Sequence, residues 1–150
     1  MAALLLISNC VLIGGCTATS SRLDRQAMHR DFDFAYQQLK VADKAYALGS
    51  WQQAILAYKS LIGEIPENAY FHFRLGNALA YDGQYPQAIE ALQKSLKIDA
   101  HQAKPWLNLS TTHLLAAQSA GTKALASLDE TDPLHSSTHE RLKLLQELLK

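Results

Sequence analysis

Hydrophobic and polar residues are distributed in three different ways along the chain. Residues 2–13 form an apolar run of about a dozen residues, which only Ser8 and Asn9 interrupt. The stretch 17–29 is polar. From Asp31 onward apolar residues recur at helical spacing, and no strand-like alternation lasts more than a few residues. The pattern predicts an all-α domain that follows a short apolar leader and a polar tether.

The helical part contains an internal repeat. The segment AYQQLKVADKAYALGSWQQAILAYKSLIGEIPEN (35–68) aligns without a gap on AYFHFRLGNALAYDGQYPQAIEALQKSLKIDAHQ (69–102), a spacing of 34 residues. Self-similarity at such a period is typical of stacked helical units. The matched pairs include Gly49 and Gly83, Trp51 and Tyr85, Ala54 and Ala88, Ile55 and Ile89, and Tyr58 and Leu92.

Each copy is predicted to form two antiparallel helices joined at its glycine. Gly49 and Gly83 can adopt the left-handed conformation that ends a helix. Ser50 is expected to cap the next helix, and Gln53 would complete a capping box. Other positions fit the same plan: Pro86 suits a first helical turn, Ala54 and Ala88 are small where helices cross closely, and Trp51, Tyr58, Tyr85 and Leu92 fill the space between helices.

A third and degenerate copy is expected over residues 103–129. Trp106 and Leu109 occupy matching positions. We expect a helix from Pro105 to Ala117, and then a shorter helix that ends near Leu128.

A final helix is predicted over residues 134–150. Asp132 and Pro133 break the chain before it. Ser137 and Glu140 have the spacing of a capping box that opens this helix. The helix is expected to cover the exposed end of the stack, with one apolar face made of Leu142, Leu145, Leu148 and Leu149.

The 34-residue period resembles the tetratricopeptide repeat, a helix–turn–helix unit. The family's Leu-Gly pair is present in the second copy as Leu75-Gly76 and is replaced by Val41-Ala42 in the first. The family's closing proline is present in the first copy as Pro66 and is replaced by Ala100 in the second. The resemblance implies an all-α fold, a short solenoid of antiparallel helix pairs over residues 31–129 with a C-terminal capping helix. It also implies a non-enzymatic protein that binds other proteins.

The end of the apolar run resembles a bacterial lipobox. Ile13-Gly14-Gly15-Cys16 is followed at once by polar residues, and the run is too short to span a bilayer as a helix. The resemblance implies a signal peptide over residues 1–15, lipid on Cys16, and a tether over residues 16–30. The residue after Cys16 is Thr17 and not aspartate, and by the same resemblance this favours the outer membrane over retention at the inner one. No lysine or arginine precedes the run, and the alternative is a buried N-terminal helix with a chance cysteine.

Composition and motifs exclude several classes of function. Fourteen basic and fourteen acidic residues cancel, so no basic face for nucleic acid is expected. There is no Gly-rich phosphate loop, HExxH or CxxC motif, and we expect no cofactor. His135, His139 and Glu140 lack the further ligands that a zinc site needs, so we expect no metal. An enzyme would need a polar cluster, such as His72, His113 and a carboxylate in one cleft.

By the resemblance, the first helix of each copy lines a concave binding groove. Tyrosines suit such a groove because they combine apolar area with a polar tip. The expected groove residues are Tyr36, Asp43, Tyr46, Tyr70, Phe73, Asn77, Tyr81, Lys104, Leu107 and Thr111, with Leu39 and Leu115 beside them.

Two alternatives qualify this groove. Phe73 and Leu107 fit packing between repeats equally well, whereas Tyr46 and Tyr81 favour the groove. Some members of the family bind a ligand carboxylate with a clamp of lysine, arginine and asparagine. Arg74 and Lys104 lie near the corresponding positions, but Asp43 would repel a carboxylate, so no clamp is expected.

These features together favour a lipid-anchored outer-membrane protein whose groove holds a protein or peptide partner. It resembles the pilotin class, which helps to assemble secretion or pilus machines, and the partner would then be a secretin or pilus component. One alternative is an adaptor for cell-wall enzymes. Another is a structural spacer that acts through its convex face.

Overall fold

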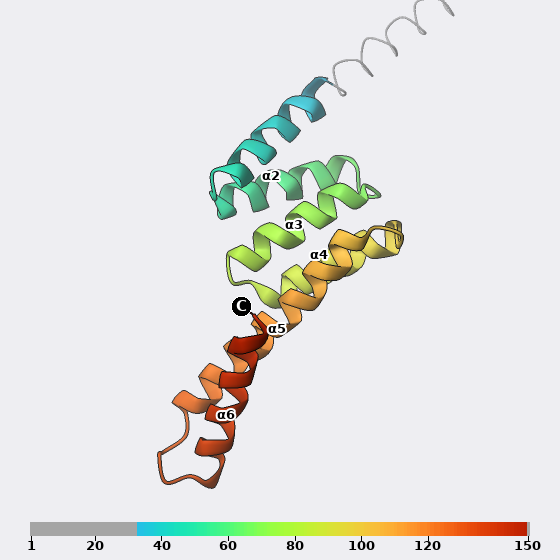
Figure 1. Cartoon of the computed structure of the whole chain (residues 1–150). Helices are drawn as coiled ribbons and strands as arrows, with labels where there is room; N and C mark the ends of the chain where they lie inside the picture. Colours follow the sequence, from blue (N-terminus) through green and yellow to red (C-terminus); the bar gives the residue numbers. More distant parts are fainter. Residues whose placement is uncertain (1–32, 150) are drawn as a thin grey trace, which may run out of the picture. The chain divides into compact units, whose positions relative to one another are not determined.

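The computed structural model describes residues 33–149, which form six helices arranged in sequence as antiparallel pairs. Contacts place residues 33–37 in a different unit from residues 38–149, and only the second unit is described further. Its helices follow the end of the helix over residues 33–47, and each packs against the next along the chain (Figure 1). They are α2 (Trp51–Glu64), α3 (Ala69–Tyr81), α4 (Tyr85–Ile98), α5 (Ala103–Ala126) and α6 (Pro133–Leu148). The all-α prediction is confirmed.

The two repeat turns have the same backbone geometry. Gly49 has φ 69° and Gly83 has φ 78°, in the left-handed region that favours glycine. In the first turn the Gly49 N–H donates to the Tyr46 carbonyl at 3.1 Å, and the Ser50 N–H donates to the Ala45 carbonyl at 2.9 Å. The second turn repeats both bonds with the same offsets. This is a Schellman motif, as the glycines predicted.

The expected capping box at Ser50 is wrong. Ser50 does occupy the N-cap position of α2, but its side chain makes no capping hydrogen bond. Its ψ of 69° differs from the extended conformation in which a side chain reaches the first N–H groups. The preceding Schellman motif fixes this backbone, so turn geometry takes precedence over side-chain capping here. Pro86, by contrast, lies in the first turn of α4 as predicted.

Small residues allow the paired helices to approach closely. Ala54 and Ala88 are both fully buried in the main core, as the repeat predicted. Gly76 faces the same crossing, since a Cβ added there would lie 2.6 Å from Leu92 Cγ and 3.1 Å from the Ala88 carbonyl oxygen. A larger side chain at Gly76 or Ala88 would push α3 and α4 apart.

The third copy differs from its prediction because α5 does not break near residue 117. It is a single helix of 24 residues, whereas α3 has 13. The position 34 residues after Gly83 is Ala117. A Cβ makes the left-handed conformation unfavourable by about 1–2 kcal/mol, so the turn of the first two copies is not favoured here. The helix therefore continues, and the predicted short helix ending near Leu128 is absent.

The last helix begins earlier than predicted. Asp132 is its N-cap, and the Asp132 carboxylate accepts a hydrogen bond from the Leu134 N–H at 2.8 Å. Ser137 lies inside the helix, where its hydroxyl donates to the Leu134 carbonyl, so the expected Ser137–Glu140 capping box is wrong. Leu142 packs onto α5 at Gly121, where a Cβ would lie 2.8 Å from Leu142 Cδ2. The sequence Asp-Pro provides both the cap and the first-turn proline, and therefore starts the helix.

Candidate functional site

Three aromatic rings form a cluster where the first helix, α2 and α3 meet. Trp51 and Tyr81 stack with ring centroids 4.4 Å apart and 12° between planes. Tyr46 meets both rings edge-on, at 5.3 Å from Trp51 and 6.4 Å from Tyr81. Tyr81 nevertheless keeps 65% of its surface exposed. The structure thus brings together the two expected groove tyrosines and leaves one of them open to a ligand.

A polar network joins the first helix, α2 and α3 beside this cluster. Asp43 Oδ1 accepts hydrogen bonds from the Tyr58 hydroxyl at 2.5 Å, the Tyr70 hydroxyl at 3.0 Å and Arg74 Nη2 at 3.2 Å. Arg74 Nε donates to the Tyr58 hydroxyl at 3.0 Å. The Arg74 guanidinium also lies 3.6 Å from the centroid of the Tyr46 ring, a cation–π contact. Asp43 therefore serves as the acceptor for three donors and is not a free groove charge.

Burial raises the pKa of the tyrosines around Asp43 and Arg74. Loss of solvent raises the pKa of Tyr58 well above its ordinary value, and its hydrogen bond to Asp43 raises it further. Burial likewise raises the pKa of Tyr46 and of Tyr70. A phenolate beside the Asp43 carboxylate would be unfavourable, since both groups would be negative. The Tyr58 and Tyr70 hydroxyls are therefore protonated hydrogen-bond donors to Asp43.

A second polar pair repeats the first one at a distance of one repeat along the chain. Asn108 Nδ2 on α5 donates to Asn77 Oδ1 on α3 at 2.6 Å. Asp43 and Arg74 are 31 residues apart, and so are Asn77 and Asn108. Because Asn77 follows Asp43 by one 34-residue repeat, and Asn108 follows Arg74 likewise, the two contacts are equivalent. The pair is ionic in the first position and neutral in the second.

A pocket of about 140 Å³ lies between α3 and α5 around the neutral pair. Both of its walls come from helices that the sequence assigned to the groove. Thr111 and Thr112 donate their hydroxyl protons to carbonyls of α5 itself. The lining residues are Asn77, Ala80, Tyr81, Asn108, Thr111, Thr112 and Leu115. Four expected residues thus meet here: Asn77, Tyr81, Thr111 and Leu115.

The other expected residues lie elsewhere. Leu39 packs against the main core, and Phe73 is half-buried against the core cluster of Leu92, Leu96 and Leu109, so helix packing accounts for both. Lys104 and Leu107 are exposed on α5 and do not line the pocket. Tyr36 lies in residues 33–37, which belong to the other unit. Cys16, with the leader and tether, lies outside the described residues.

Within residues 33–149, no group of three or more His, Cys, Asp or Glu side chains could hold a metal ion. The imidazole of His72 bonds to the Pro66 carbonyl at 2.8 Å, while His113 is exposed on α5. None of the described helices is both long enough and apolar enough to cross a bilayer.

Comparison with known proteins supports the assignment from the repeat. The tetratricopeptide repeat family matches residues 69–101, the α3–α4 pair. The structure is similar to the TPR2B domain of yeast Sti1 in a complex with pHsp70, with a TM-score of 0.54 and 20% identity over 75% of this chain and 93% of that chain. The chain has a tetratricopeptide repeat fold. A search of curated proteins gave no match.

Two residues of these polar pairs do not follow from the sequence pattern. The pattern places Arg74 only near a carboxylate clamp, and it assigns no role to Asn108. Both are paired with a residue 31 positions earlier, three less than the repeat length. A search for complementary polar residues at that spacing would have found both pairs.

Proposed function

We propose that the pocket between α3 and α5 binds an extended segment of a partner protein. The single observation that carries the proposal is that four expected groove residues from two helices line one pocket. Tetratricopeptide repeat proteins are usually non-catalytic binding scaffolds, and we propose no catalytic activity for this chain. Protein–protein interaction is the function that the repeat itself suggests.

The pocket offers groups suited to a peptide backbone. Asn108 Nδ2 is used by Asn77, but no residue within the described range 33–149 donates to Asn108 Oδ1. That oxygen can therefore accept a backbone N–H from a ligand. Tyr81 adds a flat, exposed ring already held from behind by Trp51, so little rotamer freedom is lost when a ligand packs on it.

Selection from a random-peptide display library against the full chain tests this proposal. The selected peptide is then titrated by fluorescence anisotropy. Tyr81→Ala should weaken its binding by about tenfold or more, as expected when an aromatic anchor is lost. Asn108→Ala should also weaken it, whereas Glu90→Ala on the exposed face of α4 should leave it unchanged. Equal affinity of the Tyr81→Ala variant would refute the groove as the contact surface.

We further propose that the chain is a lipoprotein held on the periplasmic side of the outer membrane by Cys16, with a pilotin-like role in assembling a secretion or pilus machine. The support is the sequence Ile13-Gly14-Gly15-Cys16 after an apolar run. Each buried acyl methylene would contribute about 0.8 kcal/mol of membrane affinity. Mass spectrometry of the mature N-terminus checks the anchor. A mature protein that begins anywhere other than Cys16 would contradict it.

A further inference from the structure

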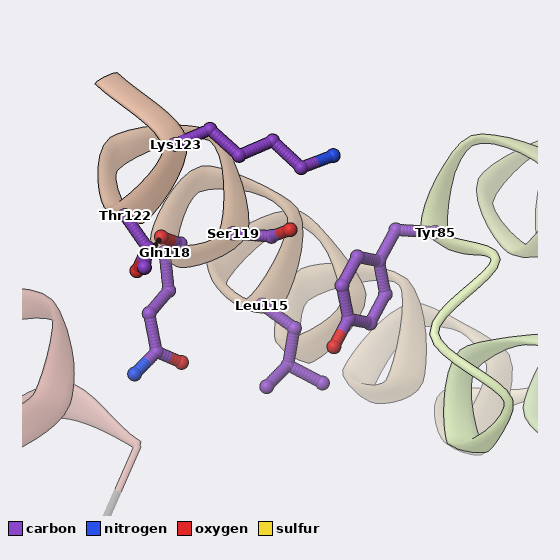
Figure 2. Close-up of a pocket in the computed structure, with 6 residues that line it drawn as sticks. All are labelled: Tyr85, Leu115, Gln118, Ser119, Thr122 and Lys123. Carbon is purple, nitrogen blue, oxygen red and sulfur yellow. Dashed lines mark hydrogen bonds between the residues drawn. The ribbon is translucent and has the colours of Figure 1, made fainter. Parts of the chain in front are cut away.

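The extra length of α5 creates a second pocket beyond the groove. Because α5 continues past Ala117, its last two turns lie beside Tyr85 at the start of α4 (Figure 2). The pocket has a volume of about 320 Å³. It is lined by Tyr85, Leu115, Gln118, Ser119, Thr122 and Lys123. Leu115 also lines the pocket between α3 and α5, so the two pockets are neighbours on α5.

The second pocket is polar and has one cation at its rim. Five of its six lining side chains are polar, and the sixth, Leu115, is apolar. The Thr122 hydroxyl already donates to the Gln118 carbonyl at 2.9 Å, so the neutral donors that face the pocket are those of Tyr85, Gln118 and Ser119. Lys123 is the only charged residue among them, and its chain extends along the rim toward Tyr85 in Figure 2. Within residues 33–149, Lys123 has no acidic side chain within ion-pair distance. A polar pocket whose one charged side chain is an unpaired cation favours an anionic group.

A second cation, Arg74, is not available for this purpose. Arg74 is bonded to Asp43 and Tyr58 and lies over the Tyr46 ring. A ligand anion at Arg74 would have to displace an anion that the protein supplies itself. Repulsion from Asp43 would oppose it further, since like charges at such a distance are unfavourable. An acidic group on a ligand is therefore directed away from the Asp43 end of the groove and toward Lys123.

We propose that the pocket at Lys123 is an anion subsite, which receives a carboxylate or phosphate-type group of the partner segment seated between α3 and α5. That a partner segment supplies the anion rests on the proposed function, whereas the binding of an anion at Lys123 does not. The bound anion would accept hydrogen bonds from the Lys123 ammonium and the Ser119 hydroxyl, while Leu115 supports the apolar part of the ligand.

The test uses the full chain, labelled with ¹⁵N, and three probes at constant ionic strength: acetate, inorganic phosphate and the neutral isostere acetamide. Acetate or phosphate should give saturable shifts of the backbone amides of Ser119, Thr122 and Lys123, and acetamide should give none. The acetate and phosphate arms distinguish a carboxylate site from a phosphate site. Lys123→Gln should abolish the shifts. Lys97→Gln is the matched control, because Lys97 is also an exposed lysine in the last turn of a helix.

Each outcome decides the matter. Saturable shifts that are lost in Lys123→Gln and retained in Lys97→Gln support the subsite. Shifts that never saturate, that acetamide reproduces, or that survive Lys123→Gln overturn it. Tyr81→Ala separates this proposal from the groove: it should weaken peptide binding by about tenfold or more while leaving the acetate or phosphate shifts intact. Once a display peptide with an acidic residue is in hand, its amide analogue should bind about threefold more weakly to the wild type, and equally to Lys123→Gln.

Discussion

Replacing Asp43 with alanine removes one acceptor from three donors at once. The buried Tyr58 hydroxyl loses the partner to which it donates, and an unsatisfied buried group costs about 1–3 kcal/mol. The loss of the ion pair with Arg74 adds little, because the two side chains are 40% and 20% exposed for Asp43 and Arg74 respectively and solvent weakens the attraction. Alanine returns about 0.5 kcal/mol through its helix propensity. The net expected loss is about 1.5 kcal/mol of unfolding free energy.

Urea denaturation followed by circular dichroism and tryptophan fluorescence measures this loss. Asp43→Asn keeps an acceptor oxygen for Tyr58 while removing the charge, so it should cost only about 0.5 kcal/mol. A double-mutant cycle with Tyr58→Phe should give a coupling energy of about 1 kcal/mol. Glu90→Ala, on an exposed face, serves as the control and should change stability little. Two results would refute the reasoning: an alanine variant as stable as wild type, or an asparagine variant as unstable as the alanine one.

Three substitutions and a rise in pH give distinct outcomes. Gly76→Ala places a methyl group 2.6 Å from Leu92 Cγ and should lower the free energy of unfolding by about 1–3 kcal/mol in urea titrations. Gly83→Ala should destabilise the protein by about 1–2 kcal/mol, because Gly83 has a positive φ. Gly63→Ala should stabilise it by about 0.5–1 kcal/mol, because the new methyl group meets nothing within 4 Å and alanine favours the helix. Equal effects of the two substitutions on stability would contradict the assigned turn. The pKa of Tyr58 is higher in the folded protein than in the unfolded chain, so above pH 10.0 the unfolded chain loses the phenol proton while the folded protein keeps it. The urea midpoint should therefore fall as the pH rises above 10.0, and it should fall less in Tyr58→Phe.

The features that sequence predicted well are set by local chemistry. A glycine followed by a capping position has few ways to end a helix, and Gly49 and Gly83 adopt the same turn for that reason. The small residues Ala54 and Ala88 recur at the repeat length and lie at the helix crossings. For the candidate site, the assignment of the groove to first helices led to Tyr81, which lines the pocket.

The features that sequence predicted poorly depend on competition or on distant contacts. The pattern predicts a turn in the degenerate copy, although Ala117 occupies the position of the turn glycine in the other copies. The predicted end of the helix is therefore wrong, and α5 continues past Ala117. Ser137 has a good capping pattern, but Asp132 starts the helix first. Asp43 was expected to face a ligand, and its bond to Arg74 depends on how two repeats stack, which no single-helix pattern reveals. Packing, likewise, decided the position of Phe73.

The recurrence of a polar contact at a separation of 31 residues constrains how this protein can evolve. The geometry of stacking fixes the two positions, so their chemistry must match within each pair. Asparagine in place of Arg74 alone would leave the Asp43 carboxylate without its ion-pair partner, beside the Tyr58 and Tyr70 phenols. Aspartate in place of Asn77 alone would face the uncharged amide of Asn108. In proteins that descend from this one, residues 43 and 74 should therefore change together. Residues 77 and 108 should also change together, but independently of the first pair.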